Sequence, residues 1–152
     1  MQTRRQMLAH SATVAGLMAA AGLLPATAMA AWNGGAFEAK NMADLMKALG
    51  GSAPTESKDV TVTGPDIAEN GAVVPVGAST ALPGVKRLLI LIEKNPAMLA
   101  ASFDVTDAVE ANVATRVKMG QSSDVFAVAM MNDGKVLFAK KEVKVTLGGC
   151  GG

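Results

Sequence analysis

The residue best suited to chemistry is the single cysteine of this 152-residue chain. It lies within the last five residues, which are Gly148, Gly149, Cys150, Gly151 and Gly152. Glycine has no side chain to bury and loses the most backbone freedom on ordering, so we expect residues 148–152 to form a flexible arm. Five extended residues span roughly 16 Å. That length is enough to carry a thiol into a narrow channel of another protein.

The chain offers no group that would activate this thiol. Its one histidine is His10, it has no tyrosine, and the nearest cation is Lys144. An ordinary cysteine has a pKa of about 8.5, and the thiolate is the nucleophile. A catalytic cysteine needs a base held in a defined geometry. We therefore expect Cys150 to be a covalent attachment point activated by a partner, with no catalytic residue in this chain. Two alternatives remain, a cysteine without function on a frayed terminus and an intermolecular structural disulfide.

The sequence also indicates no cofactor and no metal site. Ten methionines occur in the chain, and we interpret those of the mature protein as core or docking side chains. A methionine copper site is a remote alternative, because soft metals need several converging sulfur ligands.

The N-terminus has the pattern of an export signal. Arg4 and Arg5 precede an apolar stretch over 14–24, and Ala28-Met29-Ala30 follows as a small-x-small cleavage pattern. We predict a signal peptide over 1–30, and the paired arginines favour the twin-arginine route. The stretch is shorter than the roughly 20 residues that span a bilayer. We expect a periplasmic protein without a permanent membrane anchor, although a retained anchor and a chance arginine pair are alternatives.

The remaining length, 31–147, fits one domain with a real core. Cleavage after Ala30 leaves twelve basic and thirteen acidic residues, a formal charge of −1. This balance lacks the basic footprint of a nucleic-acid-binding protein. Residues 31–35 (AWNGG) are predicted to be a disordered start.

One amphipathic helix is predicted near the start of the domain. Apolar residues recur at i, i+3, i+4 and i+7, at Met42, Leu45, Met46 and Leu49. Asn41 lies close to the expected N-cap, and Gly50-Gly51 marks the C-terminus.

The rest of the domain has the sequence pattern of a β-protein. Strands are predicted in VTVTG, in the apolar run RLLILI and in NVATRVKMG, where apolar and charged residues alternate. We expect the apolar run to belong to the core, with a partner interface as the alternative. Several short strands separated by turns predict a mainly β sandwich.

The last predicted element is a hairpin that leads into the arm. Two apolar stretches flank Asn132-Asp133-Gly134, a strong turn signal. We expect the final strand to direct Val143, Val145 and Leu147 inward and Lys144 outward. Lys140, Lys141 and Lys144 are either a solvated face or a contact for anionic partners.

The segments KEVKVTLGGCGG, IAENGAVVPV and ATRVKMGQSSDVFAV, together with the leader, resemble the SoxY family of sulfur carriers in periplasmic thiosulfate oxidation. The resemblance covers essentially the whole chain. It implies an immunoglobulin-like sandwich and pairing with the carrier subunit SoxZ. It also implies that Cys150 holds sulfur intermediates covalently, with the flanking glycines as a flexible stem.

The resemblance further implies a series of partner enzymes. A haem enzyme would join thiosulfate oxidatively to Cys150, a hydrolase would release sulfate, and in some organisms a molybdenum-haem sulfur dehydrogenase would follow. The chain itself would be a non-catalytic carrier.

Two other classes of protein fit parts of the pattern. A ubiquitin-like sulfur carrier also ends in Gly-Gly, but it has a β-grasp fold and its adenylation requires cytoplasmic ATP. A non-covalent periplasmic binding module would need no cysteine and would keep its function after Cys150→Ala.

Overall fold

A computed structural model describes residues 33–147, together with Met7, His10 and Thr13. The chain divides into two units, residues 1–32 and 33–152. The three described residues of the first unit are helical. In the described part of the chain, no helix is long and apolar enough to cross a membrane. Apart from those three residues, the predicted signal peptide with Arg4 and Arg5 lies outside the described residues, and so does the arm at 148–152.

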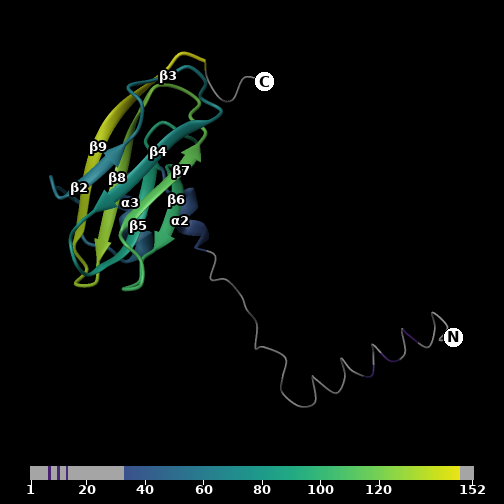
Figure 1. The fold of residues 1–152 in the computed structure, drawn as a ribbon, viewed down its shortest axis with the longest axis vertical. Helices are drawn as coiled ribbons and strands as arrows, with labels where there is room; N and C mark the ends of the chain where they lie inside the picture. The colour runs from purple at the N-terminus through teal and green to yellow at the C-terminus, as the bar shows by residue number, and fades with distance from the viewer. Residues whose placement is uncertain (1–6, 8–9, 11–12, 14–32, 148–152) are drawn as a thin grey trace. The chain divides into compact units, whose positions relative to one another are not determined.

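The second unit is mainly β, as predicted, with two helices at its start (Figure 1). The helices and strands, in chain order, are α2 (Gly34–Glu38), α3 (Met42–Leu49), β1 (Thr55–Glu56), β2 (Val60–Thr63), β3 (Ile67–Ala68), β4 (Val74–Thr80), β5 (Val85–Ile92), β6 (Leu99–Asp104), β7 (Asn112–Val117), β8 (Ser123–Met131) and β9 (Val136–Val145).

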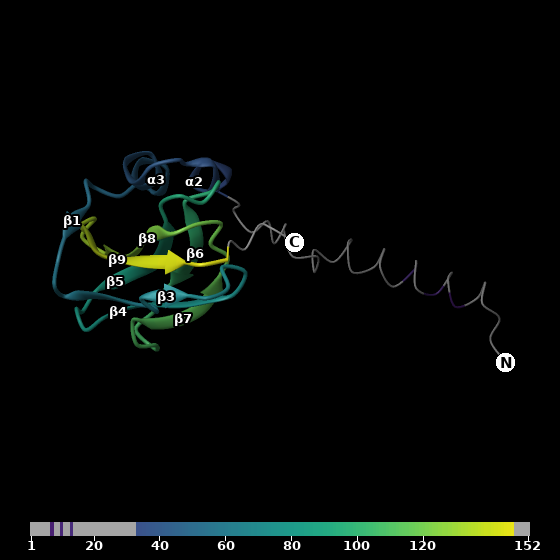
Figure 2. The ribbon, with the colours of Figure 1, turned by 90° about the horizontal axis from the view of Figure 1, so that it is seen from above.

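These elements form three layers. The larger sheet has the order β1-β9-β8-β5-β6 with β3 also beside β9, and the smaller sheet has the order β2-β4-β7. Figure 2 shows α2 and α3 on one side of the larger sheet and the strands β4 and β7 on the other side. The two sheets make the predicted sandwich, and the helices cover its outer face.

The apolar run RLLILI lies at the centre of this arrangement, within β5. Side chains alternate along a strand, and Leu88, Ile90 and Ile92 face the core between the sheets. Leu89 and Leu91 face a second core beneath the helices. Each of the five is at most 1% exposed. The prediction of a core role is confirmed, and burial on both faces explains why residues 88–92 contain no polar side chain.

The predicted helix is confirmed as α3, with its expected caps. The Asn41 side chain accepts a hydrogen bond from the Asp44 amide at 2.8 Å, and Gly50 ends the helix with a φ of 72°. The predicted disordered start is wrong where the structure describes it. Asn33 caps the short helix α2 by accepting from the Ala36 amide at 3.2 Å, and Ala36 is buried under the larger sheet.

The predicted hairpin is confirmed by β8 and β9. Gly134 in the turn has a φ of 87°, which favours glycine. The strands pair from Met130↔Val136 to Ser123↔Val143. The expected inward positions of Val143 and Val145 are confirmed by their packing in the core between the sheets. The prediction for Leu147 is wrong, because β9 ends at Val145 and Leu147 is 69% exposed.

Candidate functional site

The described chain ends three residues before Cys150, so the candidate site is the base from which the arm leaves. At this end of the sandwich, the segment that contains β3 runs alongside β9 (Figure 1). Three backbone hydrogen bonds join the two, from Lys144 N to Asp66 O at 3.0 Å, from Thr146 N to Ala68 O at 3.0 Å, and from Gly71 N to Leu147 O at 2.7 Å. The backbone is therefore held in place through Leu147, two residues past the end of β9.

Ser122 holds the opposite side of the same stretch. Backbone pairing between β8 and β9 ends at Ser123↔Val143. One residue earlier, the Ser122 hydroxyl accepts a hydrogen bond from the Val145 amide at 2.9 Å. It also donates to the Val145 carbonyl at 3.5 Å. A side chain thus continues the ladder by one step where the partner backbone has turned away.

Gly71 connects this base to the neighbouring loops. Its amide bonds Leu147, and its carbonyl accepts from the Met119 amide at 2.7 Å. The loop around Met119 is held in turn by Asn95, whose side chain donates to the Lys118 carbonyl at 2.7 Å and accepts from Gly120 N at 3.3 Å. Three loops at one end of the sandwich are therefore linked to the point where the arm begins.

Two of the three lysines of β9 form ion pairs with carboxylates of this chain. Lys141 bonds the Gly64 carbonyl at 2.6 Å and pairs with Asp66 at 2.9 Å. Lys141 also holds the pKa of Asp66 below its ordinary value, through a hydrogen bond and through its charge. Lys140 pairs with Asp124 at 3.2 Å, and this hydrogen bond raises the pKa of Lys140. Lys144 is exposed and makes no ion pair with a described residue.

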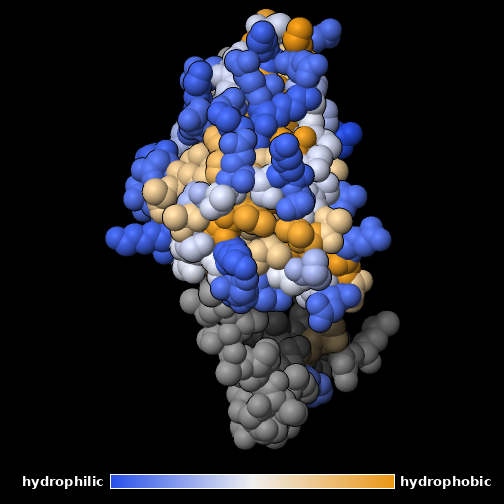
Figure 3. Space-filling view, turned by 90° about the vertical axis from the view of Figure 1, so that its left-hand side faces the viewer, coloured by the Kyte–Doolittle hydropathy of each residue, from blue (hydrophilic) through white to orange (hydrophobic). Residues whose placement is uncertain are grey.

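Three exposed apolar residues lie in or next to the segments whose backbones are bonded at the base of the arm. Ile67, Val73 and Leu147 are 58%, 55% and 69% exposed. Within 33–147, the one other large apolar side chain of comparable exposure is Val109. Figure 3 shows some apolar residues at the upper tip of one side of the molecule, a hydrophilic region below them, and a broader apolar area across the middle and lower part. Sequence reasoning missed these exposed positions, because the segments that are bonded here are distant in the sequence.

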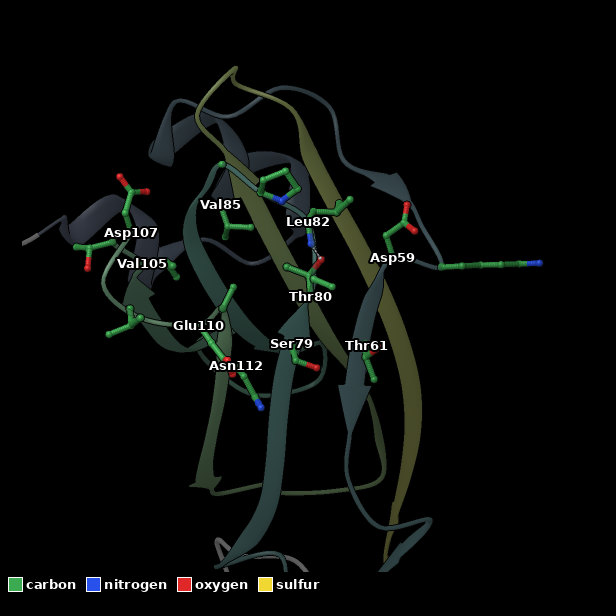
Figure 4. A pocket seen from close by; sticks show the side chains of 17 residues that line it. Asp59, Thr61, Ser79, Thr80, Leu82, Val85, Val105, Asp107, Glu110 and Asn112 are labelled. Carbon is green, nitrogen blue, oxygen red and sulfur yellow. Dashed lines mark hydrogen bonds between the residues drawn. The ribbon is translucent and has the colours of Figure 1, made fainter.

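A hollow at the opposite end of the sandwich is lined by polar, charged and apolar residues, with no cysteine or histidine among them. Its volume is about 960 Å³, and the starts of β2, β5 and β7 contribute to its lining. Asp59 and Asp107 lie on opposite sides of it (Figure 4). No group of three or more potential metal ligands occurs among the described residues. The arm base remains the candidate site because the only cysteine of the sequence follows it by three residues.

The chain is similar to proteins of known family and structure. A family model described as sulfur oxidation protein SoxY matches residues 45–150, a range that ends at Cys150. The sulfur carrier protein SoxY from Chlorobium limicola f. thiosulfatophilum is 36% identical, with a TM-score of 0.62. The match covers 69% of this chain and 96% of that one.

More distant matches concern the fold alone. A superoxide reductase (neelaredoxin) variant from Ignicoccus hospitalis is 18% identical with a TM-score of 0.51, over 57% of this chain and 78% of that one. No curated protein matches the chain. The family model matches more than half of the chain, and the SoxY structure is 36% identical over 69% of it, so the chain belongs to the SoxY family of sulfur-oxidation proteins.

Proposed function

We propose that this chain is a periplasmic sulfur carrier that holds thiosulfate-derived intermediates covalently on Cys150 and presents them to partner enzymes. The observation that carries the proposal is the placement of the only cysteine. Cys150 lies three residues beyond Leu147, whose carbonyl is bonded to Gly71, and the family match extends to Cys150. A fixed base followed by side-chain-free residues is the arrangement that a delivery arm requires.

The proposed loading step joins the Cys150 thiol to the sulfane sulfur of thiosulfate. One S–S bond forms, one proton is released, and two electrons pass to the haem enzyme that catalyses the step. The product is Cys–S–S–SO₃⁻. A hydrolase then adds water to the terminal sulfonate group, which leaves Cys–S–S⁻ and releases one sulfate and two protons.

In this scheme the carrier supplies no catalytic group of its own. Among the described residues of the mature domain there is no histidine and no tyrosine, so a base near the thiol must come from a partner's site. Pairing with SoxZ would complete the carrier. Where a sulfur dehydrogenase is present, it would oxidise the remaining persulfide. The twin-arginine leader with Arg4 and Arg5 would export the folded protein, with SoxZ as a passenger that lacks its own signal.

The test is the intact mass of the carrier from cells, before and after reductant, with thiosulfate supplied. We expect mass additions that reductant removes and that map to the C-terminal peptide. Cys150→Ser is the matched control, because it keeps a small polar side chain without a thiol. An unmodified Cys150 throughout turnover would refute the proposal.

The same experiment separates the two alternatives. A non-covalent binding module would support thiosulfate turnover in the Cys150→Ser strain. A ubiquitin-like carrier would place sulfur on the carboxylate of Gly152 and would also keep its modification. The two-sheet sandwich differs from the β-grasp fold of that class, which favours the cysteine carrier.

A further inference from the structure

We infer that Asn70 is the site of a slow covalent modification, in which the backbone amide of Gly71 attacks the Asn70 side chain and the asparagine becomes aspartate or isoaspartate. The hydrogen bond between Gly71 and Leu147 controls the reaction, because the attacking nitrogen is the donor of that bond. The inference goes beyond the proposed function, since it concerns the domain itself and holds whether or not Cys150 carries sulfur.

The reaction needs only an asparagine followed by glycine, and water. Hydroxide removes the proton of the Gly71 amide, the nitrogen forms a bond to Cγ of Asn70, and ammonia leaves. Water then opens the cyclic imide at either carbonyl, so that overall one water is consumed and one ammonia is released. Glycine favours the ring closure because it has no Cβ and allows close approach of the backbone. Among the described asparagines, only Asn33 and Asn70 precede a glycine.

The side chain of Asn70 is already placed for this attack. It is exposed to water, and its Oδ1 accepts a hydrogen bond from the Ala72 amide at 2.8 Å. Such a bond to the amide two residues ahead folds the side chain back over the intervening peptide group, which here carries the Gly71 nitrogen. The same bond withdraws electron density from Cγ. Within the described chain, Nδ2 of Asn70 has no hydrogen-bond partner, so no contact retains the ammonia that must leave.

The attacking nitrogen, in contrast, is held in place. Gly71 is buried, its amide donates to the Leu147 carbonyl at 2.7 Å, and its carbonyl accepts from the Met119 amide at 2.7 Å. An amide proton in such a bond reaches hydroxide only when the local structure opens. The rate of modification is therefore the rate of an unprotected Asn-Gly pair multiplied by the fraction of time for which Leu147 is detached.

Asn33 provides an internal comparison, because it also precedes a glycine and is exposed. Its carboxamide is held at both ends. The oxygen accepts from the Ala36 amide at 3.2 Å as the cap of α2, and the nitrogen donates to the Ala48 carbonyl at 2.9 Å. Departure of ammonia from Asn33 would break the bond to Ala48 and the cap together. We therefore expect Asn70 to react first.

Isoaspartate at position 70 loosens the base of the arm. It adds one methylene group to the main chain immediately before Gly71 and replaces a neutral amide by a carboxylate. The segment is bonded to the end of β9 at both ends, through the Ala68 carbonyl to Thr146 and through the Gly71 amide to Leu147. A longer main chain between these two anchors no longer matches the spacing of Thr146 and Leu147. We expect the bond to Leu147 to be lost in the modified chain.

The experiment follows the two asparagines in one sample. The full mature chain is incubated at mildly alkaline pH and digested with trypsin, which leaves Asn70 as the only asparagine of peptide 59–86 and Asn33 as the only one of the peptide that ends at Lys40. The mass gain from amide to acid gives the rate at each site. A synthetic peptide 59–86 gives the unprotected rate, and hydrogen exchange gives the protection of the Gly71 amide. We expect the fold to slow modification at Asn70 and exchange at Gly71 by the same factor.

Ser122→Ala tests the control by the end of β9 without touching the reacting residues. It removes the hydroxyl that bonds the Val145 amide at 2.9 Å, so Leu147 should detach more often. We expect modification at Asn70 and exchange at Gly71 both to become about fivefold faster, with no change at Asn33. Ser102→Ala is the matched control, because the side chain of Ser102 is exposed on β6 and makes no hydrogen bond to a described residue. It should leave all three rates unchanged.

Three results would overturn the inference. One is a rate at Asn70 no higher than the rate at Asn33, and another is a rate in the folded chain equal to that of the synthetic peptide. The third is an unchanged rate at Asn70 in Ser122→Ala. Failure of the proposed function is read separately, because it appears as an unmodified Cys150 during thiosulfate turnover, whereas these rates come from internal peptides that do not contain Cys150.

Discussion

Shortening the arm by one residue should lower the rate of enzymatic sulfate release far more than lengthening it by one residue. The backbone is held through Leu147 by the 2.7 Å bond from Gly71, so three residues set the reach of Cys150, about 10 Å. Deleting Gly148 shortens this reach by about 3.3 Å. A thiol that stops short of the reacting atoms loses much of its rate, since a misplacement of about 1 Å can cost roughly 100-fold. We expect enzymatic sulfate release to fall at least that far.

Inserting one glycine at the same place should lower the rate of sulfate release only slightly. The longer arm still reaches the site, and the effective concentration of the thiol falls as about the −3/2 power of arm length. Going from three residues to four then lowers the rate by only about 1.5-fold. The large loss on deletion and the small loss on insertion together indicate a tether.

The assay is sulfate release from carrier loaded with tetrathionate, with the rate of loading as the control for thiol reactivity. Loading should be equal in the deletion, the insertion and the natural chain. If insertion is as damaging as deletion, the arm acts through one specific conformation and the tether reasoning is wrong. If deletion is tolerated, the base of the arm is not fixed at Leu147.

Three further predictions concern the domain that holds the arm. Ser122→Ala removes the hydroxyl that bonds the Val145 amide, so we expect a loss of about 1 kcal/mol in unfolding free energy and faster hydrogen exchange at Val145. Gly77→Ala places a Cβ 2.5 Å from Thr63 Oγ1 and 2.9 Å from a backbone carbonyl, and should destabilise by about 1 to 3 kcal/mol in urea unfolding. Asp66 has a lowered pKa, so its stabilising contribution is present at neutral pH and is lost as the pH falls below about 4. The Tm should therefore fall more between pH 5 and pH 3 in the natural protein than in Asp66→Asn.

Each of these predictions has a control. Ser102 lies on β6 with an exposed side chain that makes no hydrogen bond to a described residue, and Ser102→Ala should leave exchange at Val145 unchanged. Adding Thr63→Ala to Gly77→Ala should restore only part of the stability, because the carbonyl of Val113 stays in place. Full recovery would contradict the steric argument. Identical acid profiles for Asp66→Asn and the natural protein would contradict the role of Lys141.

The elements that were predicted correctly are those with local signals. The helix at Met42–Leu49 combines a periodic apolar face with a capping asparagine and a C-terminal glycine. The hairpin at Gly134 carries its own turn signal. In both cases neighbouring residues decide the conformation, so sequence alone was sufficient.

The elements that were missed depend on distant segments. The strands β1 and β3 have two residues each and pair with β9 across many intervening residues, so no periodicity identifies them. Burial of β5 on both faces requires knowledge that the helices cover the sheet. Leu147 continues the apolar alternation of β9 in the sequence. It lies two residues beyond the end of the strand and is exposed.

The candidate site was predictable only in part. Cys150 was identified from its type and its glycine neighbours, and it lies outside the described residues. Nothing in the sequence indicated that Ser122, Gly71 and Asp66 hold the base of the arm. Gly71 and Asp66 bond Leu147 and Lys144 through backbone atoms. Backbone contacts leave no signature in residue type.

The position of β9 explains why the base of the arm needs so much support. As the last strand of the domain, it would present a free edge from which fraying begins. Two parallel partners cover that edge, β1 near the start of the strand and β3 at its end. The hydrogen bonds of Lys144, Val145, Thr146 and Leu147 then hold every residue up to the first glycine. If these residues frayed, the arm would lengthen and the thiol would be diluted over a larger volume, so stability at the end of β9 sets the reach of Cys150.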